Sequence, residues 1–196
     1  MTENQLKLND DKTEALLFSF LSSLKPSTVF LPGSITLGSH NIPISDSARN
    51  LGVILDSNLF MKHVIKICQT AYFELKRISS VRRFLTEDAA KTLVTSYILS
   101  RLDYCNCLLM GTPNFVIQSP QKIKIFAARL VLLAPRHYHS TPLLGKLHWL
   151  PISERIKYKV ACMCFKAMHG SGPAYLSEYM STLRLVHYAL LLTPAC

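Results

Sequence analysis

A run of regularly spaced apolar residues between positions 60 and 78 constrains the fold of this chain most. These residues recur mostly at steps of three and four: Val64, Ile67, Cys68, Ala71, Phe73, Leu75 and Ile78. That spacing places apolar side chains on one face of a helix of about 20 residues. The sequence therefore predicts a long amphipathic helix in this region.

A second helix is predicted to begin after Thr86. The Thr86 hydroxyl suits an N-cap, and Glu87 and Asp88 place carboxylates at the positive end of the helix dipole. The apolar spacing continues towards Met110, and residues 111–113 (Gly-Thr-Pro) suit a helix end. We expect one helix over this whole stretch.

A third helix is expected over about residues 121–133, shortened at its start by Pro120. A proline inside a helix costs about 3 kcal/mol, unless it lies in the first turn. Ser119 would then cap the shortened helix. The last helix is predicted over Ser153–Met168, and it ends at the Gly-Ser-Gly-Pro of residues 170–173.

The N-terminal third lacks the helical spacing of apolar residues that the rest of the chain shows. Residues 15–20 form a short apolar run that suits a strand, and residues 21–32 suit a loop. Residues 34–55 hold apolar positions interrupted by glycine and proline, as expected of short strands and turns. The predicted fold class is α+β, mostly α, with the strands at the N-terminus and a helical bundle after them.

Composition supports a folded chain that lies outside membranes. Hydrophobic residues make up 49% of the sequence and charged residues 17%, so a core is expected. No apolar run reaches the roughly 18 residues of a membrane span, and the polar start Met-Thr-Glu-Asn is not a signal peptide. We expect a cytoplasmic or nuclear protein with no membrane partner and no small-molecule substrate.

The charge balance favours a polyanionic partner. The chain holds 22 Lys and Arg against 12 Asp and Glu, a net charge of +10. The basic residues gather in two stretches: Lys62, Lys66, Lys76, Arg77, Arg82 and Arg83 in one, and Arg155, Lys157, Lys159 and Lys166 in the other. The alternative interpretation is an ordinary set of solvated helix faces with basic residues near their C-termini.

The cysteines and histidines do not predict a metal site. Cys105 and Cys107, like Cys162 and Cys164, are two residues apart in predicted helices, where that step points side chains about 200° apart. His137, His139 and His148 lie in a proline-rich stretch without a second ligand pair at zinc spacing. We expect core cysteines, no metal and no cofactor.

Six segments in chain order resemble the signature stretches of one enzyme family. They are residues 6–14 (Leu-Lys-Leu-Asn-Asp-Asp-Lys-Thr-Glu), 51–56 (Leu-Gly-Val-Ile-Leu-Asp), 100–106 (Ser-Arg-Leu-Asp-Tyr-Cys-Asn), 139–151 (with His-Ser-Thr-Pro and Leu-His-Trp-Leu-Pro), 155–169 and 173–176. Together they are similar to the C-terminal part of non-LTR (LINE-type, Jockey-like) retrotransposon reverse transcriptases, which are RNA-directed DNA polymerases.

The resemblance implies a division of the chain into four parts. Residues 1–57 would be a remnant of the polymerase palm that ends with the primer-grip strand, and residues 58–135 a thumb-like helical region. Residues 136–182 would be a C-terminal helical extension, and residues 183–196 a divergent tail.

The resemblance also implies that the chain is catalytically incomplete. A reverse transcriptase works through aspartates that hold two metal ions, Mg²⁺ in the parent enzyme. The family's aspartates precede the segment matched at Leu6, so Met1 is interpreted as an internal start and the chain as a truncated fragment. Lys12 stands where the family places a lysine near the pyrophosphate of the incoming nucleotide. We expect Lys12 to be vestigial and the chain not to be an enzyme.

What remains for such a fragment is nucleic-acid binding. The resemblance implies that the thumb-like helices lie along a primer–template backbone, so RNA or an RNA–DNA duplex is the expected partner. The residues expected to make non-specific phosphate contacts are Lys62, Lys66, Arg77, Arg82 and Arg83. Three alternatives stay open: a degenerate product with no selected function, a repurposed helical interaction module, and a polymerase completed by a second chain.

Overall fold

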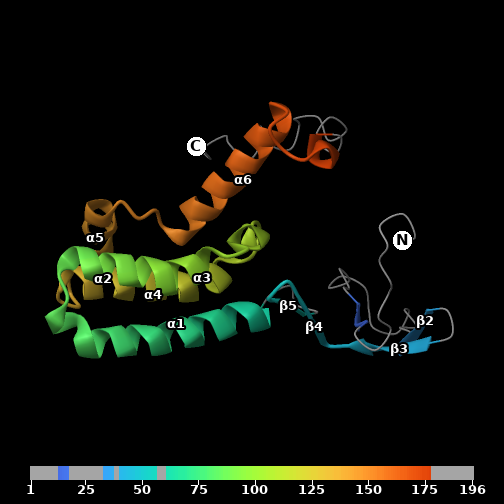
Figure 1. Cartoon of the computed structure of the whole chain (residues 1–196), viewed down its shortest axis with the longest axis horizontal. Helices are drawn as coiled ribbons and strands as arrows, with labels where there is room; N and C mark the ends of the chain where they lie inside the picture. The colour runs from blue at the N-terminus through green and yellow to red at the C-terminus, as the bar shows by residue number, and fades with distance from the viewer. Residues whose placement is uncertain (1–12, 18–32, 38–39, 57–60, 178–196) are drawn as a thin grey trace.

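The computed structural model describes residues 13–17, 33–37, 40–56 and 61–177, and it shows the expected mostly helical α+β fold (Figure 1). Lys12 and the divergent tail lie outside the described residues. The helices are α1 (Met61–Val81), α2 (Glu87–Val94), α3 (Ser100–Asp103), α4 (Asn114–Leu132), α5 (Ser140–Leu147) and α6 (Ile152–Met168). Three shorter turns join them: the 3-10 turns η4 (Arg82–Phe84) and η6 (Asn106–Leu109), and the π-helical turn η5 (Thr95–Leu99).

A helical bundle forms the main body of the molecule. α1 packs along α4, and α2, η5 and α3 run on from one another against both (Figure 1). The apolar stripe of α1 supplies Ala71, Leu75 and Ile78 to this core, which confirms the long amphipathic helix. Phe73 is the exception, because it lies on the opposite face and is 60% exposed.

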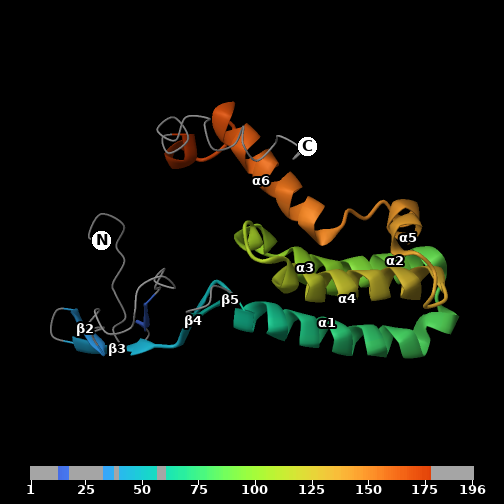
Figure 2. The ribbon, with the colours of Figure 1, turned by 180° about the vertical axis from the view of Figure 1, so that it is seen from behind.

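The short strands lie beyond the N-terminal end of α1. Strand β3 (His40–Ser45) pairs in parallel with β1 (Ala15–Leu16) and antiparallel with β2 (Ser34–Leu37). A separate antiparallel hairpin joins β4 (Ser47–Asn50) to β5 (Val53–Asp56). In both views β2 and β3 lie far from the bundle, and the β4–β5 hairpin is the part of the sheet region that reaches α1 (Figures 1 and 2).

Three hydrogen bonds fix the β4–β5 hairpin to the helices. Asp56 Oδ2 accepts from the backbone N–H of Lys62, 2.7 Å away in the first turn of α1, and Ile54 N–H donates to His63 Nδ1 at 3.3 Å. At the hairpin turn, the Tyr104 hydroxyl donates to the carbonyl of Leu51 at 2.6 Å. The hairpin is therefore held from two sides, by α1 and by the segment that follows α3.

The second helix begins as expected but ends earlier. Thr86 Oγ1 accepts from the N–H of Ala89 at 3.2 Å, which confirms the N-cap. The expected single helix towards Met110 is wrong, because the continuous helix stops at Asp103 and only the 3-10 turn η6 follows. Tyr104 is extended and Cys105 has a left-handed backbone with φ 52°. Cys105 and Cys107 therefore do not share a regular helix, and both are half-buried.

The third helix is longer than predicted. α4 begins at Asn114, and Pro120 lies buried inside it rather than at its start. Val116, one turn earlier, packs in a second core cluster with Val64 and Ile152. Burial of this first part of α4 stabilises a helix that the proline alone would have interrupted, since packing outweighs local propensity.

Residues 140–147, which we expected to be part of a loop, form the short helix α5. Pro142 lies in the first turn of α5, where its missing N–H costs nothing. His148 ends the helix with a left-handed backbone, and Trp149 N–H donates to the carbonyl of Leu144 at 2.9 Å. Trp149 is partly buried against the bundle core.

The last helix has the expected bounds to within one residue. Its first turns are anchored by Ile152 and Ile156, which are buried in the second core cluster. Beyond them α6 leaves the bundle at an angle (Figure 2). Within the described residues, no helix is both long enough and apolar enough to cross a membrane.

Candidate nucleic-acid interface

Three of the five predicted binding residues share the solvent face of α1. Lys62, Lys66 and Arg77 are all exposed. At 100° per residue they lie within about 60° of one another, on the side of the helix opposite Ala71 and Leu75. The core packing of α1 therefore leaves its cations turned outward. Lys76 is exposed on the same face.

Arg82 takes a different role from the one predicted for it. Its side chain is buried, and its guanidinium donates to three carbonyls: Leu130 O at 2.9 Å, Leu85 O at 2.7 Å and Val131 O at 2.6 Å. Two of these carbonyls belong to the last turn of α4, where helical carbonyls lack partners within the helix. Arg82 caps α4 from inside the protein and is not available to a phosphate.

Arg83, the next residue, is exposed in η4, just after α1. Its guanidinium carbon lies 4.6 Å from the centre of the Phe84 ring. Because neighbouring residues in the 3-10 turn η4 point in different directions, one arginine enters the core and the other faces solvent. The adjacent pair in the sequence gave no indication of this difference.

A hollow next to the exposed face of α1 is lined by further cationic side chains. It has a volume of about 420 Å³ and lies between the β4–β5 hairpin, α1 and the end of the α2–α3 segment. Its lining includes the cationic side chains of Arg49, Lys66 and Arg101, and the hydroxyls of Thr70 and Tyr104. None of the described residues that line it carries a carboxylate. Lys66 belongs both to the hollow and to the exposed face of α1, so the two form one cationic surface.

His63 lies at the inner wall of this hollow in its neutral form. Its Nδ1 accepts the N–H of Ile54, so the ring proton must be on Nε2. Burial lowers the pKa of His63, and the nearby charge of Lys66 lowers it further. The hollow therefore obtains its charge from the arginines and lysine rather than from His63.

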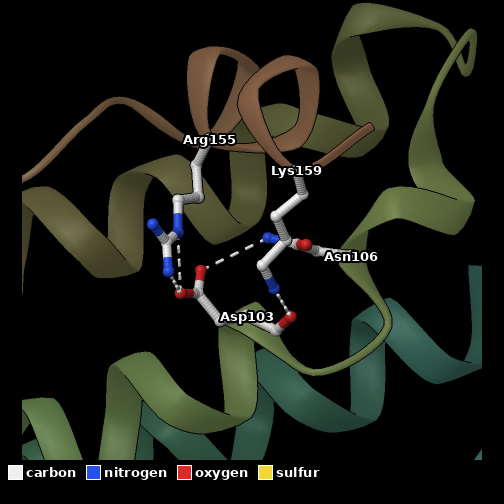
Figure 3. A network of polar contacts seen from close by, with 4 residues as sticks. All are labelled: Asp103, Asn106, Arg155 and Lys159. Carbon is white, nitrogen blue, oxygen red and sulfur yellow. Dashed lines mark hydrogen bonds and ion pairs between the residues drawn. The ribbon is translucent and has the colours of Figure 1, made fainter. Parts of the chain in front are cut away.

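The second basic stretch is used differently, because two of its members hold the fold together (Figure 3). Arg155 donates from Nε to Asp103 Oδ2 at 3.0 Å, and its Nη2 lies 2.9 Å from the same oxygen. Lys159 donates to the carbonyl of Asp103, and Asn106 Nδ2 donates to Asp103 Oδ1 at 3.3 Å. These contacts join residues from the segments 100–106 and 155–169, whose roles the sequence did not specify.

A buried lysine lies close to this network. Lys124 of α4 is 4% exposed, and burial lowers its pKa, while the charge of Asp103 opposes that effect. Asp103 is thus surrounded by Arg155, Lys159 and Lys124, so it serves as a structural counter-charge. Asp103 is only partly buried, at 23% side-chain exposure, and it does not line the cationic hollow.

Sequence reasoning missed Arg49 and Arg101 as interface residues. Arg101 lies inside a segment that resembles the family, and Arg49 lies two residues before another. Neither has a basic residue three or four positions away that would mark a charged helix face. They meet only because the hairpin folds against α1 and the α2–α3 segment. Such a long-range contact leaves no periodic signal.

The other polar residues that could carry chemistry are dispersed. His137, His139 and His148 are exposed around α5. Across the described residues, no three His, Cys, Asp or Glu side chains lie together as metal ligands do. No family model, curated protein or solved structure matches this chain.

Proposed function

We propose that this chain is the thumb-like and C-terminal part of a LINE-type reverse transcriptase, and that it holds RNA or an RNA–DNA duplex without a catalytic step of its own. The observation that carries the proposal is the continuous cationic surface formed by the outer face of α1 and the adjoining hollow. The family assignment rests on the six similar segments.

The dimensions of the surface suit a polynucleotide backbone. Lys62 and Arg77 are 15 residues apart on α1, which is about 22 Å along a helix axis. A duplex presents one phosphate charge per roughly 1.7 Å, so this face spans on the order of ten phosphates. Lys66 and the hollow extend the contact sideways towards the hairpin.

The chemistry of the surface suits backbone contact more than base reading. Lys62, Lys66 and Lys76 present ammonium groups on flexible stems, which pair with a phosphate from many directions. Base-specific recognition needs side chains held in a fixed bidentate geometry against a base edge. Binding through this surface is therefore sequence-blind and depends steeply on salt.

The hollow provides a direct test of this proposal. Fluorescence anisotropy would measure the affinity of a labelled 20-base-pair RNA–DNA hybrid for the wild-type chain and for the double variant Arg49→Gln, Arg101→Gln. Two lost phosphate contacts should weaken binding about tenfold at low salt. The matched control is Lys146→Gln, Lys157→Gln, which removes the same charge from exposed positions on α5 and α6.

The control variant distinguishes binding at a defined surface from attraction by the net charge of the whole chain. The control variant should bind the hybrid with an affinity within about twofold of wild type, since distant exposed charges are screened beyond roughly 10 Å. Equal weakening of both double variants would show that net charge alone attracts the hybrid. Unchanged binding by the hollow variant would remove the hollow from the interface.

A further inference from the structure

Aromatic rings are interleaved with the cations of the proposed binding face. Phe73 is 60% exposed and Phe84 is 74% exposed, although both are large apolar side chains. The guanidinium carbon of Arg77 lies 5.9 Å from the centre of the Phe73 ring, and that of Arg83 lies 4.6 Å from Phe84. Each exposed ring therefore has an arginine beside it.

These two rings do not complete the bundle core. α1 buries Ala71 and Leu75 on the side away from Phe73, so the position of Phe73 follows from the packing of the helix. Tyr72 differs, because its ring lies 6.1 Å from that of Phe126 on α4 and is partly used in packing. Phe73 and Phe84 leave most of their surface exposed to solvent.

The arrangement fits one class of ligand, an unpaired nucleic-acid strand. Every base has a flat π face that stacks on an aromatic ring, and alanine substitution at such contacts costs about 1–3 kcal/mol per base. Arginines beside the rings add cation–π attraction and pair with the flanking phosphates. In a duplex the bases already stack on one another, so side chains on a surface cannot reach their faces.

We infer that Phe73 and Phe84 are stacking platforms for unpaired bases, so that a single strand gains base contacts at this surface in addition to its phosphate contacts. The inference rests on the proposed function, because Lys66 and Arg77 would hold the phosphates of that strand. From Phe73 to the end of α1 at Val81 the axis rises about 12 Å. The two rings would therefore take different bases of one strand.

The test compares strands that differ only in their bases. Anisotropy would measure the wild-type affinity for a mixed-sequence 20-nucleotide DNA strand, for a strand of 20 abasic sites, and for a blunt duplex of the mixed sequence, each at 50 and 200 mM salt. The expected result is at least about tenfold tighter binding of the mixed strand than of the abasic strand, because two stacked bases at about 1–3 kcal/mol each exceed the roughly 1.4 kcal/mol that corresponds to tenfold. This comparison needs no variant.

Variants then assign the effect to the two rings. Phe73→Leu, Phe84→Leu keeps apolar side chains but removes the π faces, and it should bring the mixed strand to the affinity of the abasic strand. Phe115→Leu is the matched control, because Phe115 is equally exposed, at 61%, but lies at the start of α4. This control should bind like wild type.

Failure of the inference can be told apart from failure of the proposed function. Equal, salt-dependent binding of the mixed and abasic strands would overturn stacking and leave phosphate binding in place. Base-dependent binding that survives in the double variant would also overturn the assignment to Phe73 and Phe84. Absence of salt-dependent binding to all three probes would contradict both the inference and the proposed function.

Discussion

Asp103 and Arg155 form an ion pair across 52 residues of sequence, with Arg155 Nη2 2.9 Å from Asp103 Oδ2. Asp103 ends α3 and Arg155 lies in the first turn of α6. Because α6 meets the bundle only through its first turns, this pair and the buried Ile152 and Ile156 set the direction in which the helix leaves.

Loss of this pair should weaken the packing of α6. Both side chains are about one-quarter to one-third exposed, at 23% and 36%, so the pair lies between the surface and buried cases. Asp103→Asn should lower the free energy of unfolding by about 1–2 kcal/mol in urea denaturation. The control Glu154→Gln breaks the exposed pair with Lys157 and should cost less than about 0.5 kcal/mol. Equal effects of both substitutions would refute the role of Asp103.

Replacement of Arg82 should damage stability rather than binding. Arg82→Met removes the guanidinium that donates to the carbonyls of Leu85, Leu130 and Val131 and should cost at least about 3 kcal/mol. Arg83→Met, at the exposed neighbouring position, should change stability by less than about 0.5 kcal/mol and weaken nucleic-acid binding. Thermal and urea denaturation of the two variants would measure the difference. A stable Arg82→Met protein would contradict the buried-cap role.

The cap of α2 should contribute about 1 kcal/mol. Thr86→Ala removes the oxygen that accepts the N–H of Ala89 in the first turn, and an N-cap lost in this way typically costs about that much. Thr86→Ser keeps the oxygen and serves as the matched control. If both variants lose the same stability, the methyl group rather than the hydroxyl is responsible.

Stability should fall in mildly acidic solution because of His63. Burial lowers its folded-state pKa below the usual 6.5, so the unfolded chain binds protons more readily. The contribution of His63 is complete above about pH 6.5 and is lost as the pH drops through that value towards the lower folded pKa. Protonation would also remove the acceptor of the Ile54 N–H.

Urea denaturation at pH 7.5 and pH 5.5 measures this dependence. The wild type should lose stability between the two values, and His63→Asn, which has no titrating group at that position, should lose less. The charge of Lys66 opposes the protonation of His63, and Arg49 and Arg101 line the same hollow. Identical pH dependence in the two proteins would assign the effect to other groups.

The helical elements were largely predictable because their signals are local. The apolar period of α1, the Thr86 cap and the Gly-Pro end of α6 are all encoded within one or two turns. Two errors have a common cause in long-range packing. Burial of the first part of α4 allows Pro120 to lie inside the helix. Phe73 faces solvent because Ala71 and Leu75, on the opposite side of α1, pack into the core.

The candidate interface was only partly predictable for the same reason. Lys62, Lys66 and Arg77, which were grouped by sequence, share the exposed face of α1. Helical spacing could not show that Arg82 turns inward to carbonyls 48 and 49 residues away, nor that Arg49 and Arg101 meet at a hollow. These features depend on tertiary contacts between segments with no shared period.

The salt dependence of binding tests the central claim most directly. The affinity of the RNA–DNA hybrid would be measured between 50 and 200 mM salt for the wild type and for the triple variant Lys62→Gln, Lys66→Gln, Arg77→Gln. If these three cations contact phosphates, the slope of log K against log salt should become shallower by roughly 2–3, at about 0.9 per lost contact. An unchanged slope, in a variant that unfolds at the wild-type urea concentration, would contradict the assignment of α1 as the binding face.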